Sequence, residues 1–74
     1  MLEIGKTFNR NGYTFCVLDI INYNNRNYVL FSKENETISY EFYEMIEKVD
    51  SFSLTLVNDD ETKFNLLNIV ERSS

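Results

Sequence analysis

Short stretches in which apolar and polar residues alternate, separated by turn residues, run through most of this 74-residue chain. The segment "DSFSLTLVND" is the clearest, because Phe52, Leu54 and Leu56 are apolar and the residues between them carry hydroxyl groups. Such a period of two predicts a β-strand with one buried face. Asn11-Gly12 separates two other stretches, and Asn-Gly tolerates the positive φ angles of a tight hairpin turn, so residues 9–12 are predicted to join the first two strands. The sequence therefore predicts a sheet built from hairpins.

Residues 13–23 predict a central strand, because both of its faces are apolar. One face carries Tyr13, Phe15, Val17, Ile21 and Tyr23, interrupted by Asp19, and the other carries Cys16, Leu18 and Ile20. The following stretch "NYNNRNYVLF" predicts a hairpin whose turn is Asn24 to Asn27. In this hairpin Tyr23 and Tyr28 are expected to lie opposite each other as a cross-strand aromatic pair.

Residues 38–49 admit two interpretations. The apolar residues Ile38, Phe42, Met45, Ile46 and Val49 have helical spacing, whereas the alternation from Ile38 to Phe42 is that of a strand. Thr, Ile, Tyr and Phe favour strands, so we predict a strand with a bulge near residues 43–44, where the alternation fails.

The last segment, "NDDETKFNLLNIVERSS", predicts a C-terminal helix at about residues 59–72. Asn58 or Asp59 can cap its N-terminus, and Asp60 and Glu61 suit the positive end of its dipole. A broad apolar face is expected to pack on the sheet, and it consists of Phe64, Leu66, Leu67, Ile69 and Val70, beside a polar stripe of Asn65, Asn68 and Arg72. The predicted fold is α+β and mostly β. It is a four- to five-stranded antiparallel meander, as a curved sheet or open barrel, with one C-terminal helix in a single domain over residues 1–74.

The central segment "FCVLDIINYNNRNYVLF" resembles the signature of the YrzB-like family of short, acidic, uncharacterised bacterial proteins. The matching elements are residues 17–19 (VLD), the asparagine-rich turn, residues 28–31 (YVLF) and the acidic start of the helix at residues 59–61. The resemblance spans about residues 13–70. It implies the same meander and helix, and it brings no established activity.

Composition limits the chemistry that this chain can carry out. It has no histidine, the most common general base near neutral pH, and only two glycines, too few for a glycine-rich phosphate loop. The single cysteine, Cys16, is expected in the core and fits a reducing compartment. The chain shows neither a signal sequence nor an apolar run of about 20 residues. We therefore predict a cytoplasmic protein, not an enzyme, with no catalytic residues, no cofactor, no metal and no membrane association.

The charge of the chain is unevenly placed. Residues 1–33 hold four cations and two acids, whereas residues 34–74 hold three cations and ten acids, for a net charge of −5. Ten asparagines without alanine or proline indicate an AT-rich bacterial or phage genome. Two groups of side chains are candidates for interaction: Glu41, Glu44 and Glu47 for a basic partner, and Tyr23, Arg26 and Tyr28 for single-stranded nucleic acid.

Three functions are compatible with these features. The first is a non-catalytic cytoplasmic protein that acts by protein–protein contact, with a partner that has a basic surface. The second is a phage or mobile-element inhibitor whose acidic face imitates nucleic acid. The third is a weak single-stranded nucleic-acid binder that uses the tyrosine and arginine hairpin, which the negative net charge disfavours. An unclosed meander leaves an edge strand that can pair with another chain, so the oligomeric state stays open.

Overall fold

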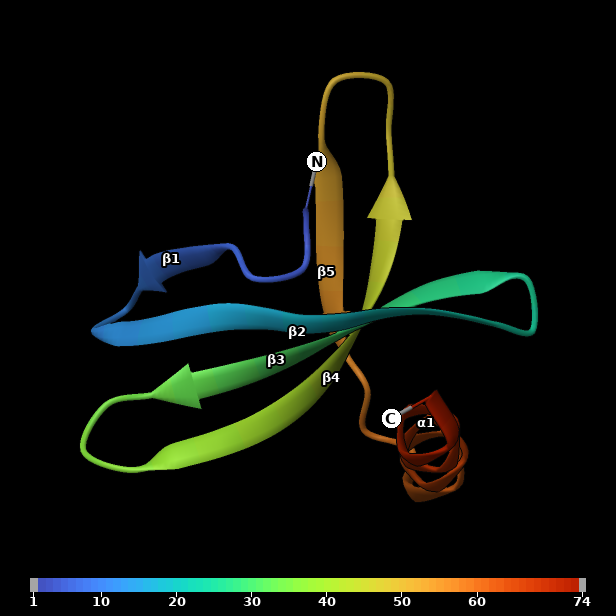
Figure 1. Ribbon diagram of the computed structural model, residues 1–74. Helices are drawn as coiled ribbons and strands as arrows, with labels where there is room; N and C mark the ends of the chain where they lie inside the picture. Colours follow the sequence, from blue (N-terminus) through green and yellow to red (C-terminus); the bar gives the residue numbers. More distant parts are fainter. Residues whose placement is uncertain (1, 74) are drawn as a thin grey trace.

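The computed structural model describes residues 2–73 and contains five strands and one helix. The elements are β1 (Thr7–Arg10), β2 (Tyr13–Tyr23), β3 (Arg26–Glu34), β4 (Ile38–Glu47), β5 (Phe52–Leu56) and α1 (Asp60–Ser73). The strands pair in chain order as one antiparallel sheet that curls into a half-barrel (Figure 1). The predicted α+β meander with a C-terminal helix is confirmed, and so is the strand expected within residues 38–49.

Two of the hairpins have two-residue turns in which both residues have positive φ. The angles are 53° and 83° at Asn11 and Gly12, and 53° and 61° at Asn24 and Asn25. This geometry is that of type I′ turns, whose twist matches that of the flanking strands. Both turns were predicted, but each is shorter than expected, because β1 continues to Arg10 and β3 begins at Arg26.

The shorter second turn changes which residues face each other across the hairpin. Tyr23 lies opposite Arg26, and Tyr28 lies opposite Ile21. The two tyrosines are therefore diagonal neighbours rather than a directly opposed pair. Their ring centroids are 6.4 Å apart, which is still within contact range.

A β-bulge at Leu18 divides β2 into two halves. Val17 lies opposite Phe31, and Asp19 lies opposite Leu30, so Leu18 has no partner in the β3 register. An extra residue turns every later side chain to the other face of the sheet. The prediction that Phe15, Val17, Ile21 and Tyr23 share one face is therefore wrong. The bulge expected near residues 43–44 is also not found, because β4 pairs with β3 without a break.

The bulge separates the core into two clusters on opposite faces of the sheet. The inner face of the curl carries Phe15, Val17, Val29, Phe31 and Met45, and it brings Phe8 of β1 near Leu54 of β5. The rings of Phe8 and Phe15 stack with centroids 5.3 Å apart, and both meet Phe31 edge to face. The outer face carries the second cluster, Ile21, Tyr28, Val57 and Leu66. Cys16, expected in the core, is half-buried and belongs to neither cluster.

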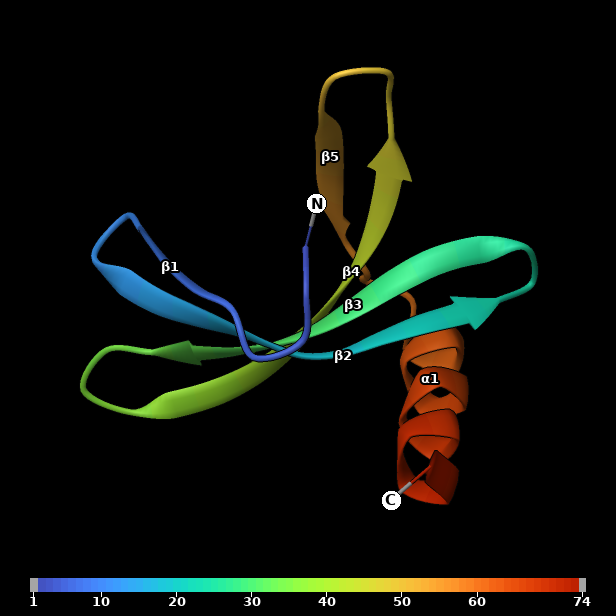
Figure 2. The ribbon, with the colours of Figure 1, turned by 45° about the horizontal axis from the view of Figure 1, so that its top comes forward.

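Helix α1 packs beneath the β2–β3 hairpin (Figure 2) and uses only part of its apolar surface. Leu66 is fully buried, whereas Phe64 is 64% exposed and Leu67 is 47% exposed. The amide Nδ2 of Asn65 donates a hydrogen bond of 3.0 Å to the hydroxyl of Tyr23. The prediction that Phe64 and Leu67 pack on the sheet is therefore wrong, and Asn65 lies at the packed side of the helix instead of in an exposed polar stripe.

The β4–β5 hairpin stands away from the rest of the sheet (Figure 1). Its alternation is as predicted, but only Leu54 packs against the inner cluster, while Phe52 and Leu56 are exposed. The expected half-buried strand is thus buried at its centre alone.

Two neighbouring leucines on α1 test which side of the helix carries the packing. We expect Leu66→Ala to lower the free energy of unfolding by about 2–4 kcal/mol, because it opens a cavity in the outer cluster. Leu67→Ala, the matched control, is expected to cost less than about 1 kcal/mol. Urea denaturation followed by circular dichroism measures both values, and equal losses would contradict this packing.

Candidate functional site

The tyrosines and arginine of the β2–β3 hairpin are engaged within the protein. Tyr28 is only 6% exposed and packs in the outer cluster. Tyr23 accepts the hydrogen bond from Asn65, and Arg26 Nη1 lies 3.3 Å from Glu44 Oε1. A stacking platform for bases needs exposed rings, and the buried face of Tyr28 does not provide one in this conformation.

The three predicted glutamates do not form one surface. Glu41 lies 3.8 Å from Lys33 Nζ and accepts a hydrogen bond of 3.2 Å from the hydroxyl of Tyr43. Burial, followed by the charge of Glu41, raises the pKa of Tyr43 above its ordinary value. Glu44 pairs with Arg26 on the opposite face of β4, since the two glutamates are three residues apart on a strand. Glu47 is exposed at the end of the strand.

The inner face of the curl holds an aromatic cleft that our sequence analysis missed. It has a volume of about 300 Å³, and its walls include Phe8, Tyr13, Phe31 and Tyr43. Lys33 Nζ lies 4.3 Å from the centroid of the Tyr13 ring and also pairs with Glu41. The ammonium group of Lys33 therefore already has a carboxylate and an aromatic ring as neighbours within the protein. Aromatic residues on four strands become neighbours only when the sheet curls, which strand periodicity does not reveal.

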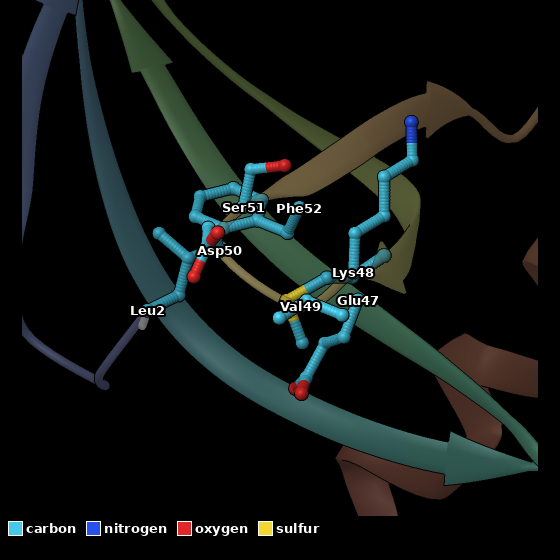
Figure 3. A pocket seen from close by; sticks show the side chains of 8 residues that line it. Leu2, Glu47, Lys48, Val49, Asp50, Ser51 and Phe52 are labelled. Carbon is cyan, nitrogen blue, oxygen red and sulfur yellow. The ribbon is translucent and has the colours of Figure 1, made fainter.

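Another hollow, of about 530 Å³, lies between the N-terminal segment and the turn from β4 to β5 (Figure 3). Leu2 and Asp50 lie at one end of it, and the side chain of Lys48 points away (Figure 3). Across residues 2–72, no hydrogen bond or ion pair joins the side chains of Glu47, Lys48 and Asp50.

The strongest candidate site is an apolar groove between α1 and the first half of β4. We call it the α1–β4 groove. It has a volume of about 330 Å³ and borders Glu41 and Lys63. Its apolar walls are Tyr40, Phe42, Leu56, Val57, Phe64 and Leu67. Tyr40 is 66% exposed, comparable to Phe64, and Leu67 and Leu56 are also exposed. Large exposed apolar patches mark interaction sites on soluble proteins.

The start of α1 determines how Phe64 is presented at this groove. Asp59 caps the helix, as predicted, because its Oδ2 accepts hydrogen bonds from Thr62 N at 3.0 Å and Thr62 Oγ1 at 2.6 Å. These bonds, the side-chain bond first, lower the pKa of Asp59 below its ordinary value of 3.8. The cap lies two residues after Val57. The N–H of Val57 donates a hydrogen bond to the carbonyl of Phe42, and this bond ties the segment before the helix to β4. The helix therefore begins directly beside β4.

Comparison with protein-family models, curated proteins and solved structures finds no match for this chain. The resemblance to the YrzB-like family therefore stays a prediction. No helix within residues 2–73 has the length and apolar character required to span a membrane. That same part of the chain contains no group of three or more potential metal-ligating His, Cys, Asp or Glu side chains.

The helix cap predicts a pH dependence of stability. We expect Asp59→Ala to melt at a lower temperature than the wild type near neutral pH, because Thr62 loses its acceptor. Since the folded-state pKa is lowered, the cap stabilises fully above the ordinary pKa and is lost as the pH falls through the folded-state value. The melting temperatures of the two proteins are therefore expected to converge in acid. Asn58→Ala serves as a control, and a difference that persists unchanged in strong acid would contradict this role.

Proposed function

We propose that this protein is a non-catalytic cytoplasmic module that binds another protein at the α1–β4 groove. The observation that carries this proposal is the gathering of exposed Tyr40, Leu56, Phe64 and Leu67 around one groove. Burying exposed apolar side chains is the main driving force of protein association. Aromatic residues at the centre of such a patch are the residues that contribute most to binding.

The surroundings of the groove favour a protein partner with basic residues. Residues 34–74, which form most of its walls, hold ten acids and three cations. Complementary charge at the rim increases the rate of association and sets specificity. Glu41 pairs with Lys33 and Glu44 pairs with Arg26, and these pairings give no support to an acidic face that imitates nucleic acid. The burial of Tyr28 likewise gives no support to nucleic-acid binding at the hairpin.

Site-specific photo-crosslinking tests this proposal. Benzoylphenylalanine in place of Phe64 keeps an aromatic side chain at the groove, and the same group in place of Val49 serves as the control. Val49 is 99% exposed but lies on the β4–β5 turn, outside the groove. In an extract of the cells that produce the protein, we expect a crosslinked product from position 64 and none of that mass from position 49.

The captured protein is then purified and its affinity is measured directly. We expect Phe64→Ser to weaken binding by at least about tenfold, as is typical of a central aromatic residue, and Val49→Ser to leave it unchanged. Equal affinities for the two variants would contradict the groove as the binding surface. A crosslink between two copies of this chain would show that the groove binds a second copy instead of a different protein, and would contradict the proposed partner.

A further inference from the structure

We infer that the partner enters the α1–β4 groove as an extended strand, rich in alternating apolar and basic residues, that pairs with the free edge of β4. This inference rests on the proposed function and adds the conformation and chemistry of the binding segment. Recognition of this kind joins main-chain hydrogen bonds to side-chain pockets at every second residue.

The first half of β4 has an open edge. The short strand β5 pairs only with residues 43–47 of β4, whereas β3 pairs along nearly the whole of β4 on its other side. Within residues 2–73, no strand covers the β5 side of residues 38–41. Figure 1 shows this half of β4 at the margin of the sheet, with β5 beside the other half. An added strand would therefore continue the line of β5.

The backbone groups available at this edge follow from the hydrogen bonds around β5. The carbonyl of Phe42 accepts a bond of 3.0 Å from Val57 N, and Lys48 N donates a bond of 2.7 Å to the carbonyl of Ser51. Even-numbered residues of β4 thus direct their N–H and C=O groups toward β5. Because this direction alternates along an antiparallel strand, Ile38 and Tyr40 present their N–H and C=O groups to the open side.

The edge of β2, in contrast, has features that discourage pairing. Beyond the bulge at Leu18, β1 no longer covers β2, but Asp19 Oδ1 accepts a hydrogen bond of 2.9 Å from Ile20 N. Bulges and inward-pointing charges are the devices by which natural sheets block edge-to-edge pairing. The open half of β4 carries exposed Ile38 and Tyr40 and leads directly to the groove.

Charge indicates the composition of the added strand. Glu34 and Glu36 lie at the turn that precedes the edge, and Asp60 lies one helical turn before Phe64. Lys63 is the one cation that borders the groove within residues 2–72. Lysine or arginine at every second residue would lie on the face of β4 that carries Glu41, which borders the groove, while the apolar residues between them enter the groove. A second copy of this chain, with its net charge of −5, is a poorer match.

Fluorescence anisotropy with the full chain and short labelled peptides tests this inference. The first peptide alternates lysine with valine and phenylalanine, the second has glutamate in place of lysine, and the third rearranges the first to helical spacing. We expect saturable binding of the first peptide, weakened by salt, and markedly weaker binding of the other two. Absence of saturable binding by the first peptide, or tighter binding of the helical isomer, would overturn the inference.

A matched pair of variants separates the edge from the groove. Tyr40→Ala removes the side chain, whereas Tyr40→Pro also removes the outward N–H, a change that edge strands tolerate. We expect the Tyr40→Pro variant to bind the first peptide about tenfold more weakly than the Tyr40→Ala variant does, because a carbonyl of the peptide loses its hydrogen-bond donor. Circular dichroism checks that each variant is folded. If Tyr40→Pro unfolds the protein, Ile38→Pro and Ile38→Ala are used as the matched pair instead.

The outcomes distinguish the two proposals. Equal affinities of the proline and alanine variants would overturn strand pairing. If Phe64→Ser still weakened binding in that case, the proposed function would stand without strand pairing. If Tyr40→Pro lost binding and Phe64→Ser had no effect, pairing with the edge of β4 would stand, and the groove would be overturned as the binding surface. If the wild type formed concentration-dependent dimers that Tyr40→Pro abolished, the strand at this edge would come from a second copy of the chain, and the inference of a different, basic partner would be overturned.

Discussion

The bulge at Leu18 is the constraint on which the rest of the structure depends. Without it, Phe15, Val17 and Ile21 would lie on one face, and no large residue of β2 after the bulge would change sides to meet α1. With it, Phe15 and Val17 join the inner aromatic cluster, while Ile21 faces Leu66 of α1. One long strand thus supplies both cores of a chain too short to devote a separate strand to each.

The divided core explains where the helix lies and what it leaves uncovered. The outer cluster joins the turn end of the β2–β3 hairpin to Val57 and Leu66, and α1 packs there instead of crossing the whole sheet. The outer side of β4, with Tyr40 and Phe42, therefore lies next to the helix but is not sealed by it. The α1–β4 groove remains open because α1 packs against the outer cluster alone and leaves the neighbouring part of β4 uncovered.

Much of the fold could be predicted from local signals, whereas the candidate site could not. Asn11-Gly12 and the asparagines after Tyr23 determine turns because few residues tolerate positive φ, and the acids after Asn58 determine the helix start. The position of the bulge depends on which partner residues of β3 fit each face, and this information is not local. The groove escaped prediction because α1 is apolar around most of its circumference, so periodicity did not show which part packs.

The exposure of Phe64 is a consequence of the packing of α1. Phe64 and Leu66 are about 200° apart around a helix, so the two side chains cannot face the sheet together. Turning α1 to bury Phe64 would expose Leu66, Ile69 and Val70 and would break the bond from Asn65 to Tyr23. The helix cap at Asp59 and the hydrogen bond from Val57 to Phe42 further tie the start of α1 to β4. The fold therefore holds Phe64 and Leu67 in a defined orientation at the surface. A partner would therefore meet these two side chains on backbone that is already ordered, which lowers the entropy cost of binding.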